Sequence, residues 1–104
     1  MNQNQFDCRI SEEDVQMLRA LAHPLRLRLV MELMGRGTCN VTQLQEVLEI
    51  PQSTVSQHLT KLKQNKVVRF ERRGLEVYYQ VHNEKVSEVV KTLFSIKIGV
   101  KTPL

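Results

Sequence analysis

The sequence predicts an α+β fold that is mainly helical, with about five helices and one two-stranded β-hairpin. Two observations lead to this fold class. Apolar residues recur every three or four positions in five segments, which is the spacing of helices with one buried face. Only over residues 67–81 does the pattern change to β-branched and aromatic residues with strand-like alternation, interrupted by the turn pair Arg73-Gly74.

Length and composition predict one domain. A chain of 104 residues with 41% apolar residues can bury one modest core, so we expect a single domain over residues 1–104, with a flexible arm at 1–10 and a flexible tail at 95–104. No apolar run reaches membrane-spanning length, and residues 1–5 lack the charged-then-apolar order of a signal peptide. Two cysteines form no disulfide framework. These features predict a cytoplasmic protein with reduced thiols and no membrane partner.

The first predicted helix opens at Ser11, which can cap it, and the three acidic residues that follow suit the positive end of the helix dipole. Pro24 fits the first turn of a second helix, which ends at Gly35-Arg36-Gly37. Arg26 and Arg28 lie off the leucine stripe of this second helix, where they can contact phosphate or acidic side chains. We expect Arg28 to pair with the glutamate one turn further on.

A helix-turn-helix is predicted next. Asn40 and Gln43 form a capping-box pattern at the start of a short third helix. The brief link Glu49-Ile50-Pro51 leads into a fourth helix, which lies within residues 50–63. A short amphipathic helix, a tight link and a polar-faced helix are typical of this motif, although its usual turn glycine is absent.

The fourth helix has two opposed faces. Val55, Leu59 and Leu62 form one apolar stripe, whereas the other face carries hydroxyl, amide and basic side chains and no acid. Such groups hydrogen-bond to base edges and phosphates. The alternative is a polar surface helix that happens to lack acids. The candidate DNA-binding residues of this helix are Gln52, Ser53, Thr54, Ser56, Gln57, His58 and Lys61.

A basic hairpin follows the fourth helix. Its strands are predicted over residues 67–72 and 75–81, with Arg72 and Arg73 at the tip as further candidate DNA-binding residues. A hairpin in this place is a wing, which puts cations on the DNA backbone or in the minor groove. Residues 51–83 carry six basic and two acidic side chains, whereas the N-terminal half is net acidic. The positive charge therefore coincides with the predicted DNA-binding unit.

The last predicted helix, residues 84–94, is rich in valine, which is a weak helix former, and so it needs packing partners. Together with the first helix it offers more apolar surface than one small core can take. A two-fold homodimer would bury the excess and would set two recognition helices about one DNA turn apart, matching an inverted-repeat operator. The predicted dimer interface comprises Val15, Leu18, Val86, Val89, Val90, Leu93 and Phe94.

Four stretches of the chain resemble the ArsR/SmtB family. They are Ala22–Arg26, Asn40–Leu44, Gln52–Leu62 and Arg73–Tyr79, and the resemblance extends over residues 11–94. It implies a winged helix-turn-helix fold and the function of a homodimeric, sequence-specific DNA-binding transcriptional repressor. The residues that fall where the family reads the major groove are Gln52, Ser53, Ser56 and Gln57.

The chain departs from this family at its metal sites. Many relatives bind metal through a Cys-Val-Cys triplet at the third helix, where this chain has Asn40-Val41-Thr42. Others use an Asp-x-His pair at the start of the last helix and two histidines near its end, where this chain has Asn83-Glu84-Lys85 and Ser95–Gly99. Borderline-soft metals, which such sites bind, need several converging Cys, His or carboxylate ligands. We therefore expect no metal site and no cofactor.

Cys8 and Cys39 remain as redox candidates. Some relatives sense oxidants or sulfur species through paired thiols, and a position just before a helix N-terminus, such as that of Cys39, can lower a thiol pKa. The alternative is that Cys39 is a packed small apolar residue and Cys8 an incidental residue of the arm. From the sequence both interpretations stay open.

The function classes can be ranked from these features. A DNA-binding repressor accounts for the acid-free helix and the basic wing together. A winged-helix protein-interaction module without DNA binding is the alternative, and it would leave both features without a purpose. We expect no enzyme, because the chain has no nucleophile–base–carboxylate arrangement and no glycine-rich phosphate loop.

Overall fold

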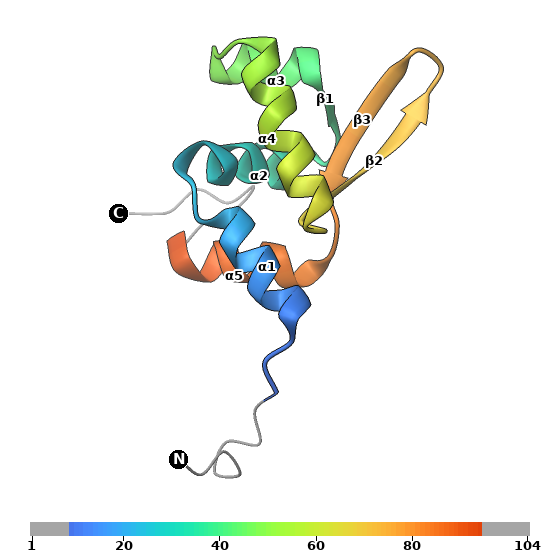
Figure 1. Ribbon diagram of the computed structural model, residues 1–104. Helices are drawn as coiled ribbons and strands as arrows, with labels where there is room; N and C mark the ends of the chain where they lie inside the picture. Colours follow the sequence, from blue (N-terminus) through green and yellow to red (C-terminus); the bar gives the residue numbers. More distant parts are fainter. Residues whose placement is uncertain (1–8, 95–104) are drawn as a thin grey trace.

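The computed structural model describes residues 9–94, which form five helices and a three-stranded antiparallel sheet (Figure 1). Most of the predicted arm, the whole predicted tail and Cys8 lie outside these residues. The elements are α1 (Glu12–Leu21), α2 (Pro24–Arg36), β1 (Cys39–Asn40), α3 (Val41–Leu48), α4 (Gln52–Gln64), β2 (Val68–Arg73), β3 (Glu76–Val81) and α5 (Glu84–Phe94). The predicted fold class is confirmed, with one short strand more than expected.

Side-chain caps fix where four of the helices begin, including α5, where Asn83 Oδ1 accepts from the Val86 N–H at 3.3 Å. Ser11 Oγ accepts a hydrogen bond from the Asp14 backbone N–H at 3.0 Å, as predicted. The capping box at α3 is also confirmed, because Asn40 Oδ1 accepts from Gln43 N–H at 2.8 Å and Gln43 Oε1 accepts from Asn40 N–H at 2.9 Å. A cap that the sequence did not predict is His23, whose Nδ1 accepts from the Leu25 N–H at the start of α2.

The sheet has the order β1-β3-β2. Strand β1 was not predicted, because a two-residue strand carries no alternation; it exists through pairing with β3, where Cys39 lies opposite Tyr79. The wing hairpin was predicted, but its turn lies one residue later, at Gly74-Leu75. Gly74 has φ +64°, which suits the first position of a two-residue hairpin turn.

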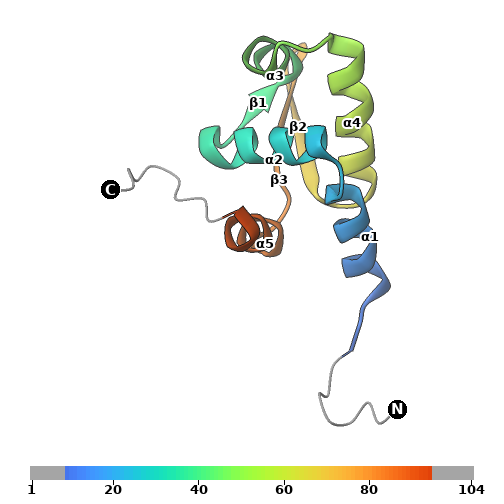
Figure 2. The same cartoon turned by 90° about the vertical axis from the view of Figure 1, so that its left-hand side faces the viewer.

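The core lies where α2, α3 and α4 meet the base of the sheet. Its buried side chains include leucines from all three helices, the valines of residues 67 and 68, and Val86 and Val90 of α5. Figures 1 and 2 place α3 and the hairpin tip at one end of the molecule and α1 and α5 at the other. No helix within residues 9–94 is long and apolar enough to cross a membrane.

Candidate nucleic-acid interface

The buried side of α4 sets the rotation of the whole helix. Val55, Leu59 and Leu62 are fully buried, and α4 packs against α1, α2, α3 and β2. A helix fixed along this stripe must turn its opposite face to solvent. That outer face carries Gln52, Ser53, Gln57 and Lys61, all exposed, whereas Thr54 and Ser56 are half-buried at its edges.

The link that orients α4 contains no glycine, although a glycine is usual in the turn of this motif. Glu49 ends α3 in the left-handed conformation, with φ +56°, and its N–H bonds back to the Gln45 carbonyl at 2.8 Å. Pro51 then precedes the first turn of α4, where a missing N–H costs little. The absence of a turn glycine therefore did not count against the predicted helix-turn-helix.

The outer face of α4 is free of internal partners. Within residues 9–94, Gln52, Ser53 and Gln57 make no side-chain hydrogen bond, and the Thr60 hydroxyl donates only to the carbonyl of Ser56. No acidic residue belongs to this helix. Amide and hydroxyl groups with unused hydrogen-bonding capacity are what base edges and phosphates require.

The wing carries two arginines in different environments. The Nη2 of Arg73 lies 3.1 Å from Glu71 Oε1, and its guanidinium lies 4.8 Å from the centre of the Tyr78 ring. Arg72 is exposed and forms no ion pair with any residue of the described range. Lys63 lies over the Phe70 ring at 4.5 Å and so joins α4 to β2. The charge of Arg72 is therefore more available to an external anion than the charge of Arg73.

His58 does not share the outer face of α4 with the other candidates, which corrects that part of the prediction. Its Nδ1 accepts a hydrogen bond from Arg26 Nε at 3.2 Å, and its ring centre lies 4.7 Å from that of His23. Burial, followed by the nearby His23 and Arg26, lowers the pKa of His58 below its ordinary value. His58 is therefore a neutral acceptor that faces α2. The sequence did not reveal this contact, because its partner lies 32 residues away.

The expected pairing on α2 was also wrong. Glu32 pairs with Arg36, whose Nε lies 2.9 Å from Glu32 Oε1, and not with Arg28. Arg28 and Arg36 each lie one helical turn from Glu32, so spacing alone did not distinguish the two possible pairs. Arg28 is exposed on α2.

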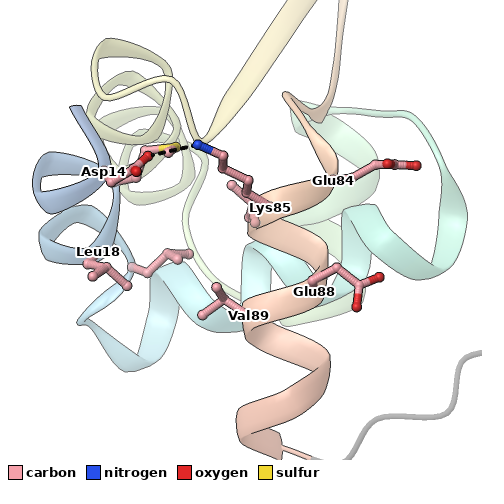
Figure 3. A pocket seen from close by; sticks show the side chains of 9 residues that line it. Asp14, Leu18, Glu84, Lys85, Glu88 and Val89 are labelled. Atoms are coloured by element: carbon pink, nitrogen blue, oxygen red, sulfur yellow. Dashed lines mark hydrogen bonds and ion pairs between the residues drawn. The ribbon is translucent and has the colours of Figure 1, made fainter. Parts of the chain in front are cut away.

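A second candidate surface lies between α1 and α5. A groove of about 510 Å³, here called the α1–α5 groove, is lined by apolar side chains of both helices, and Leu18 and Val89 face each other across it (Figure 3). Lys85 Nζ and Asp14 Oδ1, 3.4 Å apart, bridge it at one end. Leu18 is 53% exposed and Leu93 of the same molecular end is 68% exposed.

The predicted dimer interface needs one correction. Val86 and Val90 are buried inside the protomer, at 2% and 0% exposure, so they have no surface to offer a partner. Their burial against the core leaves the opposite side of α5 outward. The predicted interface residues that do reach the surface are Val15, Leu18, Val89, Leu93 and Phe94.

The residues at the family's metal positions do not fit a metal. Asn40 already uses its side chain, with Oδ1 capping α3 and Nδ2 donating to Glu76 Oε1 at 2.7 Å. Lys85 is a cation paired with Asp14. In the part of the chain that the structure describes, no group of three or more His, Cys, Asp or Glu side chains is placed to hold a metal ion.

Of the two redox candidates, only Cys39 lies within the residues that the structure describes, and its environment contradicts one expectation. Its side chain is 1% exposed in the core, where β1 pairs with β3. Burial raises the pKa of the Cys39 thiol, and this outweighs the smaller opposing influence of Arg36. A position before a helix N-terminus thus does not activate this thiol.

Comparisons with known proteins agree with this architecture. A helix-turn-helix domain family matches residues 21–69. The transcriptional repressor PagR of Bacillus anthracis is 46% identical over 86 residues, which are 83% of this chain and 86% of PagR. The crystal structure of PagR superposes with a TM-score of 0.75 and covers 79% of this chain and 93% of that one.

A second relative is the repressor SmtB of Mycobacterium tuberculosis. It is 41% identical over 75 residues, which are 72% of this chain and 55% of SmtB. PagR matches this chain over most of the length of both proteins, and the helix-turn-helix match includes α2, α3 and α4. The chain belongs to the ArsR/SmtB family of winged helix-turn-helix transcriptional repressors.

Proposed function

We propose that this protein is a homodimeric repressor that acts in the cytoplasm, binds an inverted-repeat operator in duplex DNA, and does so without a metal or other cofactor. The observation that carries the proposal is the outer face of α4. A buried stripe holds this face outward, and it presents amides, hydroxyls and a lysine with no acid. Its relatives PagR and SmtB are transcriptional repressors.

Base reading and backbone anchoring fall to different residues. The exposed Gln52, Ser53 and Gln57, with Ser56 and Thr54 at the edges, can enter the major groove because an α-helix fits there. Lys61, Arg72 and Arg73 supply charge for phosphates. We assign Arg72 the larger share of the wing's contribution, since Glu71 already neutralises much of the charge of Arg73.

A second copy of this chain is the proposed occupant of the α1–α5 groove. Leu18, Leu93 and Phe94 are exposed large apolar side chains at this end of the molecule. A two-fold axis there would present the same patch from both protomers and would leave both α4 helices and both wings free. The dimer therefore accounts for an apolar surface that the monomer leaves uncovered.

Control by metal is not part of the proposal, because Asn40 and Lys85 are engaged in other contacts at the family's ligand positions. Thiol control through Cys39 is disfavoured for the native state by the burial of its side chain. Regulation through the amount of repressor alone is consistent with both points.

The test is capture of genomic DNA fragments by the protein, followed by binding titrations at several salt concentrations. We expect fragments that share an inverted repeat, with affinity falling steeply as salt rises. Binding that is absent or independent of salt would favour the alternative, a winged-helix module that binds proteins. Zinc added in modest excess should leave the operator affinity unchanged.

A further inference from the structure

A notch lined by polar and charged residues lies beside the outer face of α4, between that helix and the first turn of α2. Its volume is about 400 Å³. The residues that line this α2–α4 notch are Arg26, Gln57, His58, Thr60, Lys61 and Gln64. Two of them are cations, two are amides, and none is acidic. Gln57 belongs both to the notch and to the proposed base-reading face, so the two sites are continuous.

Arg26 is held in the notch by neutral acceptors. Its Nε donates to His58 Nδ1 at 3.2 Å, and its Nη1 donates to the Ala20 carbonyl at 3.3 Å. Among residues 9–94 it forms no ion pair, so its charge is not neutralised by a carboxylate. The Nη2 group has no hydrogen-bond partner in the same range. A guanidinium with a fixed orientation and unused donors is suited to a phosphate oxygen.

His58 can hold Arg26 in this way only while its Nδ1 is unprotonated. Burial and the neighbouring His23 and Arg26 lower the pKa of His58, which favours the neutral ring that this hydrogen bond requires. His23 in turn uses its own Nδ1 to cap α2, the helix that carries Arg26. Lys61 is the other cation of the notch, and no acid lines it. Both histidines therefore fix geometry while Arg26 and Lys61 supply charge.

We propose that the α2–α4 notch binds one phosphodiester group of the DNA backbone, with Arg26 and Lys61 as its charged ligands and His58 as the residue that positions Arg26. This rests on the proposed function, since it requires α4 to lie on duplex DNA. When the outer face of a helix enters the major groove, backbone phosphates pass along its flanks. The notch is on such a flank.

The first experiment measures duplex affinity against salt for the full chain and for R26Q, with R28Q as the matched control. Arg28 carries the same charge on the same helix but does not line the notch. Between about 50 and 200 mM salt, R26Q should reduce the slope of log affinity against log salt by about 0.9, the value for one phosphate. Its affinity should fall about tenfold on operator and random duplex alike. R28Q should match the wild type.

The second experiment identifies the phosphate. Single phosphates of the operator are replaced in turn by neutral methylphosphonates. The wild type should lose affinity at one position in each half-site that no longer matters to R26Q. R26K should keep the salt slope, because it keeps the charge. H58N, whose Oδ1 can accept where the imidazole Nδ1 did, should retain the wild-type sensitivity at that phosphate, and H58L should lose it.

Several outcomes would overturn the proposal that the notch binds a phosphate. One is an equal change of the salt slope in R26Q and R28Q, which would mean that any positive charge on α2 contributes in the same way. Another is a lower melting temperature of R26Q with an unchanged slope, which would make Arg26 structural. Inorganic phosphate that binds the wild type but not R26Q, without any R26Q effect on DNA, would mean a free-anion site. Wild-type protein that binds no duplex would overturn the proposed function itself, and the notch with it.

Discussion

Replacing Leu18 by alanine should weaken the dimer by a calculable amount. Leu18 exposes 53% of its surface in the protomer, on the wall of the α1–α5 groove. Full burial of a leucine side chain is worth about 1.5–3 kcal/mol, so covering the remaining half is worth about 1 kcal/mol. A two-fold interface contains the residue twice. The loss is then about 2 kcal/mol per dimer, or about 30-fold in the dimer dissociation constant.

Sedimentation equilibrium of L18A measures that constant directly. The matched control is V47A, which removes an exposed apolar side chain from α3, at the opposite end of the molecule. V47A should leave the dimer unchanged, and L18A should also weaken binding to an inverted repeat more than binding to a single half-site. Equal dimer constants for L18A and the wild type would refute the assignment of this groove to a second copy.

Four further predictions concern single side chains. In binding titrations, Gln57→Ala should reduce the binding free energy at the operator by about 1–3 kcal/mol and relax the sequence preference of the protein. Arg72→Ala should instead weaken binding to all duplexes alike and reduce the salt slope by about 0.9. Asn40→Ala should lower the free energy of unfolding by about 1 kcal/mol in urea melts through loss of the α3 cap, with Thr42→Ala as the near-neutral control. Cys39 should alkylate far more slowly in the native protein than in urea. Because burial raises the pKa of its thiol, the contribution of Cys39 to the free energy of unfolding is complete below the ordinary thiol pKa and is lost as pH rises through the raised value. Fast native alkylation would restore the redox hypothesis.

Features fixed by neighbours in the chain were predictable. The caps at Ser11 and Asn40 act over three residues, so spacing identified both. The apolar stripe of α4 was equally clear, because Val55, Leu59 and Leu62 return on one side of a helix. The outward direction of the polar face followed from that stripe. Local physics thus accounts for the helix-turn-helix and for most of its candidate contacts.

Features fixed by distant partners were not predictable. Strand β1 exists only through its pairing with β3, in which Tyr79, forty residues along the chain, lies opposite Cys39. The direction of His58 depends on where α2 places Arg26. The valines of α5 had the right period for a helix, but period alone cannot tell which half of a broad apolar face meets the core. In the structure Val86 and Val90 take the core side, which leaves Leu93 outside.

The central claim is that two copies of α4, held by one dimer, read duplex DNA. Hydroxyl-radical footprinting of the captured operator tests it most directly. We predict two protected segments related by an inverted repeat, with centres about 10 base pairs apart, and weak protection by L18A at a concentration where the wild type protects fully. A single protected segment, or equal protection by L18A and the wild type, would contradict the claim.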